Sequence, residues 1–272
     1  EITTRLVGSE MCIRDSSQAA SEWQNRPLES LYMIVWMDGI VFKVRENGKV
    51  INKTVYLCVG LNKEGLKEVL GMWVGKNESA AFWMGVLTDL KARGVENILV
   101  TVTDNLNGFT ETIKSVFPTS TTQICVVHQI RNSCRYVVWK EKKEFTSDLK
   151  NIYNAPTKEA AKMELENFEQ KWGTKYPYAI RSWRNNWEEL TVFFDFPVEI
   201  RKIIYTTNLI ENLNGKIRKY TKNKLSFPND DALKKSVYLA ITEIEKKWYQ
   251  PIWNWALIFN QFITIFENRI QA

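Results

Sequence analysis

Three β-rich segments joined by tight turns open the ordered part of this 272-residue chain. They cover residues 31–45, 53–61 and 67–74, and the turns between them contain Asn47-Gly48 and Gly65. Tight turns of this kind connect neighbouring antiparallel strands, whereas parallel strands need a long crossover connection. The pattern therefore predicts an antiparallel meander at the start of a sheet.

The segments that follow alternate between helical and strand patterns. Apolar residues have helical spacing over 78–93 and 108–116, and short buried-strand patterns lie over 97–102 and 121–127. The order of elements is therefore β-β-β-α-β-α-β, followed by a long helical stretch and a further helix from about residue 207 to 220. This order predicts an α/β fold with helices on the faces of a mixed sheet, and it matches the ribonuclease-H-like fold.

Residues 129–205 are helical and aromatic, and strand signals almost vanish there. We expect an all-helical insertion domain, placed before the last helix of the core. The core is then built from residues 17–128 and completed by residues 206–272, which hold the helix of Glu211 and the C-terminal helices. Most tryptophans of the insertion are expected in its interior, with stacking on unpaired bases as the alternative: Trp139, Trp172, Trp183 and Trp187.

Residues 1–16 show neither a helical nor a strand period, and they lack the apolar core of a secretory signal. The run from Val7 to Ser16 resembles translated sequencing-adapter read-through. We therefore expect residues 1–16 to be an unstructured artefact, with an ordinary disordered N-terminus as the alternative.

Composition excludes several classes of protein. The chain has 11 Trp, 13 Phe and 10 Tyr against 12 Gly and 7 Pro, which excludes a mainly disordered protein. Four scattered cysteines indicate reduced thiols rather than a disulfide scaffold. The longest apolar stretch, residues 253–266, is too short to span a membrane, so no membrane partner is expected. The net charge of +6 is a mild hint of a polyanionic partner, and the single histidine excludes mechanisms that need two.

Three acidic residues stand where carboxylates from separate segments could converge. Asp38 ends a seven-residue apolar run, Asp104 follows the strand over 97–102, and Glu211 lies on the helix after residue 207. Taken singly, they could be a hydrogen-bonded turn residue, a helix N-cap and a surface residue. Taken together, they could form an oxygen-ligand site for two Mg²⁺ or Mn²⁺ ions about 4 Å apart, which suits phosphodiester chemistry.

Four motifs in order resemble bacterial insertion-sequence transposases of the Mutator family, over about residues 23–269. They are residues 31–39, which include Asp38; 102–104 together with 107–109; 125–132 (CVVHQIRN); and 205–214 (YTTNLIENLN). The resemblance implies that Asp38, Asp104 and Glu211 form the catalytic, metal-binding triad of a DDE enzyme. The family usually has Asp-Gly after the second of these strands, where this chain has Asp104-Asn105. The family also carries an N-terminal helical DNA-binding region, so we expect this chain to be N-terminally truncated.

Further residues are candidates for binding or positioning DNA. Between Glu211 and Asp230 there are five basic residues and no acid, which favours contacts with backbone phosphates over a merely solvated face. A structural zinc ion at the Cys125-x-x-His128 pair would need four ligands, and a buried cysteine beside a hydrogen-bonded histidine is the plainer alternative. The candidates for DNA contact are His128, Arg131, Asn208, Lys216, Arg218, Lys219 and Lys222.

The expected activity is metal-dependent DNA cleavage at the ends of an insertion element, followed by transfer of the freed 3′-hydroxyl to target DNA. Two alternatives stay open: a ribonuclease-H-like nuclease or resolvase that cuts without joining, and a catalytically dead DNA-binding remnant. The expected partners are DNA, as element ends and target, and further copies of the chain. The expected location is the bacterial cytoplasm, in association with the nucleoid.

Overall fold

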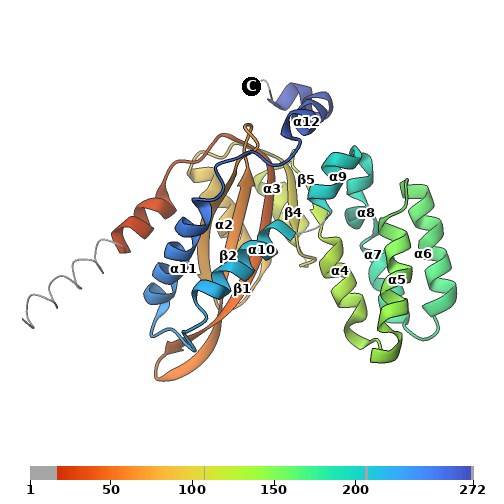
Figure 1. Cartoon of the computed structure of the whole chain (residues 1–272), viewed down its shortest axis with the longest axis horizontal. Helices are drawn as coiled ribbons and strands as arrows, with labels where there is room; N and C mark the ends of the chain where they lie inside the picture. The colour runs from red at the N-terminus through yellow and green to blue at the C-terminus, as the bar shows by residue number, and fades with distance from the viewer. Residues whose placement is uncertain (1–16, 107, 206–207, 271–272) are drawn as a thin grey trace, which may run out of the picture. The chain divides into compact units, whose positions relative to one another are not determined.

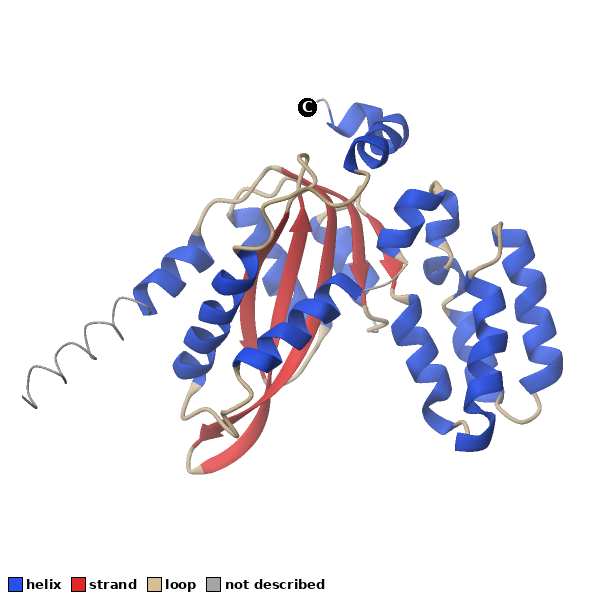
Figure 2. Ribbon diagram, in the orientation of Figure 1, coloured by secondary structure: helices blue, strands red, loops and turns tan. Residues whose placement is uncertain are grey.

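A computed structural model describes residues 17–106, 108–205 and 208–270. The expected artefact over residues 1–16 and the motif residues Asn107, Thr206 and Thr207 lie outside this range. Within it, five strands form one mixed sheet in the order β3-β2-β1-β4-β5 (Figure 2). No helix of the described residues is both long enough and apolar enough to cross a membrane.

The meander consists of β1 (Leu31–Glu46), β2 (Lys49–Leu61) and β3 (Lys67–Gly75), paired antiparallel as predicted. Asn47 and Gly48 form the two-residue turn between β1 and β2, and both have positive φ angles, 48° and 76°. This backbone conformation is the one that a tight hairpin turn requires, and Asn-Gly adopts it readily. The β1–β2 pairing then runs without a break from Glu46 opposite Lys49 to Ile34 opposite Leu61.

The second half of the sheet is parallel. Strand β4 (Asn97–Thr103) pairs with β5 (Thr121–Ile124), and helix α3 (Phe109–Val116) lies between them in sequence. A parallel pair needs such a crossover, usually a helix. Three antiparallel strands followed by a parallel pair form a ribonuclease-H-like mixed α/β core, which confirms the predicted fold class.

The strand β3 forms one edge of the sheet, and side chains cover part of that edge. Gln24, which lies in a helix over residues 17–25, accepts a hydrogen bond from the backbone N–H of Met72 at 2.9 Å. Arg26 donates to the carbonyl of Val69 at 2.7 Å. The carboxylate of Glu245 accepts from the N–H of Val69 at 2.7 Å. These bonds satisfy backbone groups that an edge strand otherwise leaves open.

The described chain divides into two compact units. The first contains residues 17–99, 108–120 and 208–270. Its helices are α2 (Ala80–Ala92), α3, α10 (Asn208–Tyr220), α11 (Asp230–Glu245) and α12 (Trp255–Ile270). Helix α10 packs on β1 and α11 on β3, on the near face of the sheet in Figure 1, with α2 behind it. Trp83 of α2 is fully buried and stacks on Phe109 with ring centroids 4.6 Å apart.

The second unit contains residues 100–106 and 121–205 and is mostly helical. Its helices are α4 (Val126–Ser133), α5 (Lys142–Tyr153), α6 (Lys158–Trp172), α7 (Pro177–Asn185), α8 (Trp187–Leu190) and α9 (Val198–Ile204), with short 3-10 turns between some of them. Trp172 and Trp183 are buried here as expected, whereas the side chain of Trp139 is 86% exposed. The prediction that residues 129–205 form a separate insertion domain stays a prediction.

The strand predicted over residues 121–127 is shorter in the structure. Strand β5 ends at Ile124, and helix α4 begins at Val126. The buried residues Val126, Gln129 and Ser133 are spaced three and four apart, which is the period of a helix face. A short apolar run cannot be assigned to strand or helix by periodicity alone, which explains the error.

Gln123 holds β5 to the helical part of the second unit. Its side chain is fully buried, donates to the carbonyl of Leu190 at 2.9 Å and accepts from the N–H of Phe193 at 2.7 Å. We expect Gln123→Ala to lower the free energy of unfolding by about 2–4 kcal/mol, because two buried backbone groups lose their partner. Urea denaturation of the purified chain measures this change.

Thr121→Ala is the matched control in the same strand, where Thr121 is half-buried. It should change the free energy of unfolding by less than about 1 kcal/mol, the range of strand propensities. Equal losses in the two variants would show that the Gln123 side chain does not anchor this unit.

Candidate functional site

Asp38 is a carboxylate in the interior of the sheet. It lies on β1 opposite Leu57 of β2, and it is 9% exposed. Its Oδ1 accepts a hydrogen bond from the backbone N–H of Gly39 at 2.7 Å, and its Oδ2 accepts one from Nδ2 of Asn214 at 2.8 Å. A buried charge is tolerated only when donors or cations compensate for the lost water. These two donors give both oxygens of Asp38 a partner.

Asn214 is the site residue that the sequence analysis did not single out. It lies on α10, where Ile210, Leu213 and Ile217 are buried with it. Its Nδ2 bonds to Asp38, while its buried Oδ1 has no hydrogen-bond partner among the described residues. The available signal was the excess of amides in the YTTNLIENLN motif, because amides on a buried helix face need a polar partner inside the protein.

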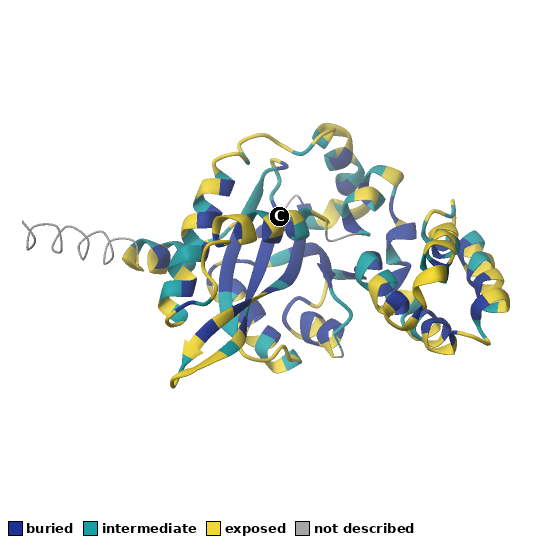
Figure 3. Ribbon diagram, turned by 60° about the horizontal axis from the view of Figure 1, so that its bottom comes forward, coloured by how far each residue is buried: buried dark blue, intermediate teal, exposed yellow. Residues whose placement is uncertain are grey.

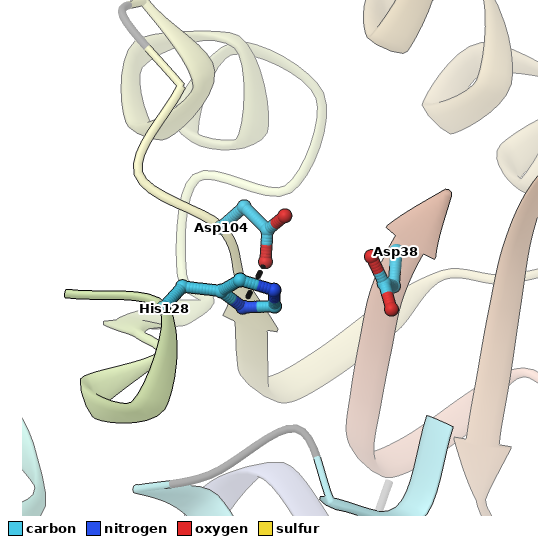
Figure 4. A group of neighbouring side chains, drawn as sticks. All are labelled: Asp38, Asp104 and His128. Atoms are coloured by element: carbon cyan, nitrogen blue, oxygen red, sulfur yellow. Dashed lines mark ion pairs between the residues drawn. The ribbon is translucent and has the colours of Figure 1, made fainter. Parts of the chain in front are cut away.

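Asp104 and His128 form a second pair of functional side chains. Asp104 follows directly on the last residue of β4, and His128 lies on the first turns of α4. Nδ1 of His128 and Oδ1 of Asp104 are 2.7 Å apart, and both side chains are half-buried (Figure 4). The N-cap of α3 is Gly108, so Asp104 does not have the N-cap role that was one alternative for it.

The pairing changes the protonation of His128. Burial by itself lowers the pKa of the imidazole, but its hydrogen bonds to Asp104 and Cys125 outweigh burial and raise the pKa to about 10. The imidazole is therefore a cation at neutral pH when no metal is bound. A protonated imidazole has no free lone pair for a metal, so in this state His128 orients the carboxylate of Asp104.

One group of side chains among the described residues could hold a metal ion: Asp38, Asp104 and His128. One potential ligand atom of each lies within 4.8 Å of the other two (Figure 4). Carboxylate oxygens are the preferred ligands of hard divalent cations such as Mg²⁺ and Mn²⁺. The two aspartates therefore fit such an ion. Cys125 is not part of this group, and no group with four zinc ligands occurs in the described chain.

Glu211 is not a member of this group. It is half-buried on α10, three residues before Asn214, and side chains three apart lie on the same side of a helix. Its predicted part in a triad with Asp38 and Asp104 stays a prediction.

The predicted DNA-contacting residues are mostly exposed. Asn208, Arg218, Lys219 and Lys222 are exposed and Lys216 is half-buried, all on α10 or just after it. Arg131 is exposed on α4. Within the described chain, none of the four basic residues from Lys216 to Lys222 takes part in an ion pair.

Comparison with known proteins gives consistent matches. The profile of the family described as "Transposase, Mutator family" matches residues 9–251. The transposase for insertion sequence element ISRM3 of Rhizobium meliloti is 43% identical over 253 residues, which are 93% of this chain and 63% of that protein. The transposase for IS905 of Lactococcus lactis is 32% identical over 93% of this chain and 66% of its own length. The chain thus spans just under two thirds of these curated relatives.

A structural match was found to a chain of a solved simian T-cell lymphotropic virus intasome. The match covers 54% of this chain and 50% of that chain, with a TM-score of 0.27 and 15% sequence identity. At these values the likeness carries no inference.

The hydrogen bond between Asn214 and Asp38 can be tested by measuring the free energy of unfolding of variants. We expect Asn214→Ala to lower the free energy of unfolding by about 1–3 kcal/mol, because the buried Oδ2 of Asp38 loses its side-chain donor. Asn212→Ala, at an exposed position of the same helix, should change it by less than about 0.5 kcal/mol. If urea denaturation showed equal losses of unfolding free energy for the two variants, the hydrogen bond between Asn214 and Asp38 would be contradicted.

The protonation of His128 can be followed by NMR, because it is the only histidine in the chain. In metal-free buffer we expect it to stay protonated well above its ordinary pKa of about 6.5. Since the folded-state pKa is the higher one, the stabilisation is complete below about pH 6.5 and is lost as the pH rises towards 10.

Asp104→Asn should bring the pKa of His128 down, because burial then acts with less opposition. Asp195→Asn, an exposed acid of the same unit, should leave it unchanged. A midpoint near 6.5 in the unmodified chain would contradict the ion pair.

Proposed function

Because this chain belongs to the Mutator family of transposases, we propose that it is a DDE transposase that cuts DNA at the ends of an insertion element and joins them to target DNA. The observation that carries this proposal is the pair of aspartates, Asp38 and Asp104, in one potential metal site of a ribonuclease-H-like core. Carboxylates on such a core suit phosphodiester chemistry that depends on divalent metal.

Asp38, Asp104 and Glu211 are the proposed ligands of two Mg²⁺ or Mn²⁺ ions. The donor chemistry supports oxygen-preferring cations, and the position of Glu211 on the helix that brings Asn214 to Asp38 supports its inclusion. When bound, the ions would supply charge neutralisation at the attacking and leaving oxygens of the phosphodiester. The protein's own residues prepare the site for this: Asn214 fixes Asp38, and His128 fixes Asp104.

The proposed DNA contacts are electrostatic. Basic side chains that take part in no ion pair within the described chain favour backbone phosphates, and the candidates near Glu211 are Lys216, Arg218, Lys219 and Lys222. The amide of Asn208, at the start of α10, is proposed as a further contact. His128 and Arg131 are proposed to position DNA at Asp104. We further propose that the helices over residues 129–205 act as an insertion domain and that several copies of the chain act together on paired ends.

The test is an assay with labelled duplexes that carry the terminal repeats found beside the gene. We expect Asp38→Ala, Asp104→Ala and Glu211→Ala each to reduce cleavage by more than about a hundredfold, because each removes a metal ligand, while DNA binding stays near that of the unmodified chain. Glu111→Ala, an exposed acid on α3, should cleave normally. Chelation of divalent ions should stop the reaction, and added Mg²⁺ or Mn²⁺ should restore it.

The products separate the three candidate functions. Joined product supports a transposase, cut ends without joining indicate a hydrolytic nuclease, and binding without cutting indicates a non-catalytic DNA-binding protein. A variant of the triad that cleaves at a near-normal rate removes that residue from the proposed site.

A further inference from the structure

We propose that Asn214 belongs to the candidate metal site through its side-chain oxygen, Oδ1, which accepts a hydrogen bond from a water in the hydration shell of a divalent cation at Asp38. The amide then has two separate contacts. Its Nδ2 holds the carboxylate of Asp38, and its Oδ1 holds a water of the cation. The inference rests on the proposed function, because it takes a divalent cation at Asp38 as the ligand. It adds a positioning residue that the acidic triad does not contain.

The oxygen of this amide is a buried acceptor without a donor in the protein. Asn214 is 9% exposed, and its Oδ1 has no hydrogen-bond partner among the described residues. Most buried polar atoms have a partner, and leaving one without costs about 1–3 kcal/mol. An apolar side chain would avoid this cost on a helix face that already buries Ile210, Leu213 and Ile217. The amide oxygen therefore points to a donor that comes from outside the chain.

The surroundings of Asp38 keep bulk water away from this oxygen. Met37 and Ile40, on the same strand, are each 1% exposed, and the central part of the sheet is buried (Figure 3). Helix α10 packs on β1 and brings Asn214 to Asp38 there. A buried water needs several polar partners, typically about three hydrogen bonds. A cation bound to Asp38 meets this need, because it holds the water by its charge.

The covalent geometry of the amide keeps Oδ1 within reach of such a hydration shell. Nδ2 of Asn214 lies 2.8 Å from Oδ2 of Asp38. Oδ1 is two bonds from Nδ2, so it lies at most about 5.4 Å from Oδ2 of Asp38. Mg²⁺ binds oxygen at about 2.1 Å, and a water donates a hydrogen bond over about 2.8 Å. A path from the carboxylate through cation and water reaches up to about 7 Å, which covers the distance to Oδ1.

The chemistry of a hydrated cation supplies the donor that Oδ1 lacks. Carboxylates accept hydrogen bonds and do not donate them, so the acidic ligands of the site cannot serve Oδ1. Mg²⁺ gives up its waters reluctantly and is usually bound through one or two carboxylates, so several waters stay on it. A divalent cation polarises these waters and makes them strong donors. An outer partner of this kind orients the ligands of a metal and raises its affinity.

The test is a titration of the metal-free chain with Mg²⁺, without DNA, followed by NMR. We expect the ¹³Cγ resonance of Asn214 to move downfield, because accepting a hydrogen bond polarises the carbonyl and deshields its carbon. The backbone amide of Gly39, which donates to Oδ1 of Asp38, reports the binding of the cation independently. Asn214→Ala identifies the Cγ resonance by its loss. It should lower the affinity for Mg²⁺, measured at Gly39, by about ten- to a hundredfold.

Asn212 is the matched control, because it is an exposed asparagine on the same helix. Its Cγ resonance should stay in place during the titration, and Asn212→Ala should leave the affinity for Mg²⁺ unchanged. The titration of the unmodified chain decides the question even if Asn214→Ala is less stable, because it needs no substitution.

Two results overturn the inference and leave the proposed function standing. In the first, the Gly39 amide responds to Mg²⁺ while the Cγ resonance of Asn214 does not, so that the cation binds at Asp38 without Oδ1. In the second, a folded Asn214→Ala variant binds Mg²⁺ as tightly as the unmodified chain. If neither Gly39 nor Asn214 responds to Mg²⁺, the proposed metal site fails together with this inference.

Discussion

The burial of one carboxylate in an apolar strand constrains much of this molecule. Asp38 sits among residues that exclude water, so the chain must supply donors for both of its oxygens. One donor comes from its own strand, and the other must come from an element packed over that face of the sheet. Helix α10 provides it through Asn214 while burying Ile210, Leu213 and Ile217. The position of α10, and of Glu211 on it, is therefore tied to the solvation of Asp38.

The second aspartate, Asp104, has a charged partner, the imidazole of His128, rather than an amide donor. Asp104 directly follows the end of β4, and His128 reaches it from the start of α4. The two aspartates thus differ in surroundings: Asp38 is buried with neutral donors, and Asp104 is half-buried beside a cation.

Much of the fold could be predicted because its signals are local. The Asn47-Gly48 turn fixes the hairpin register, and the alternation along β1 identifies its exposed face. The end of β5 could not be predicted, because Cys125, Val126 and Val127 suit a strand and a buried helix equally. For the candidate site, the sequence identified Asp38, Asp104 and His128, but not the partner of Asp38. That partner is decided by how α10 packs on the sheet. Asn214 lies 176 positions after Asp38, and no local sequence pattern records a contact at that separation.

The covered margins of the sheet restrict how copies of this chain can associate. Gln24, Arg26 and Glu245 occupy backbone groups along β3, and Phe227 occupies those of Lys43 and Arg45 on the side of β1 away from β2. A strand from another molecule finds few free backbone groups at these places, so ribbon-like growth and amyloid-type templating are disfavoured there. Copies of the chain that associate at these regions therefore do so through side-chain contacts rather than through backbone pairing of strands.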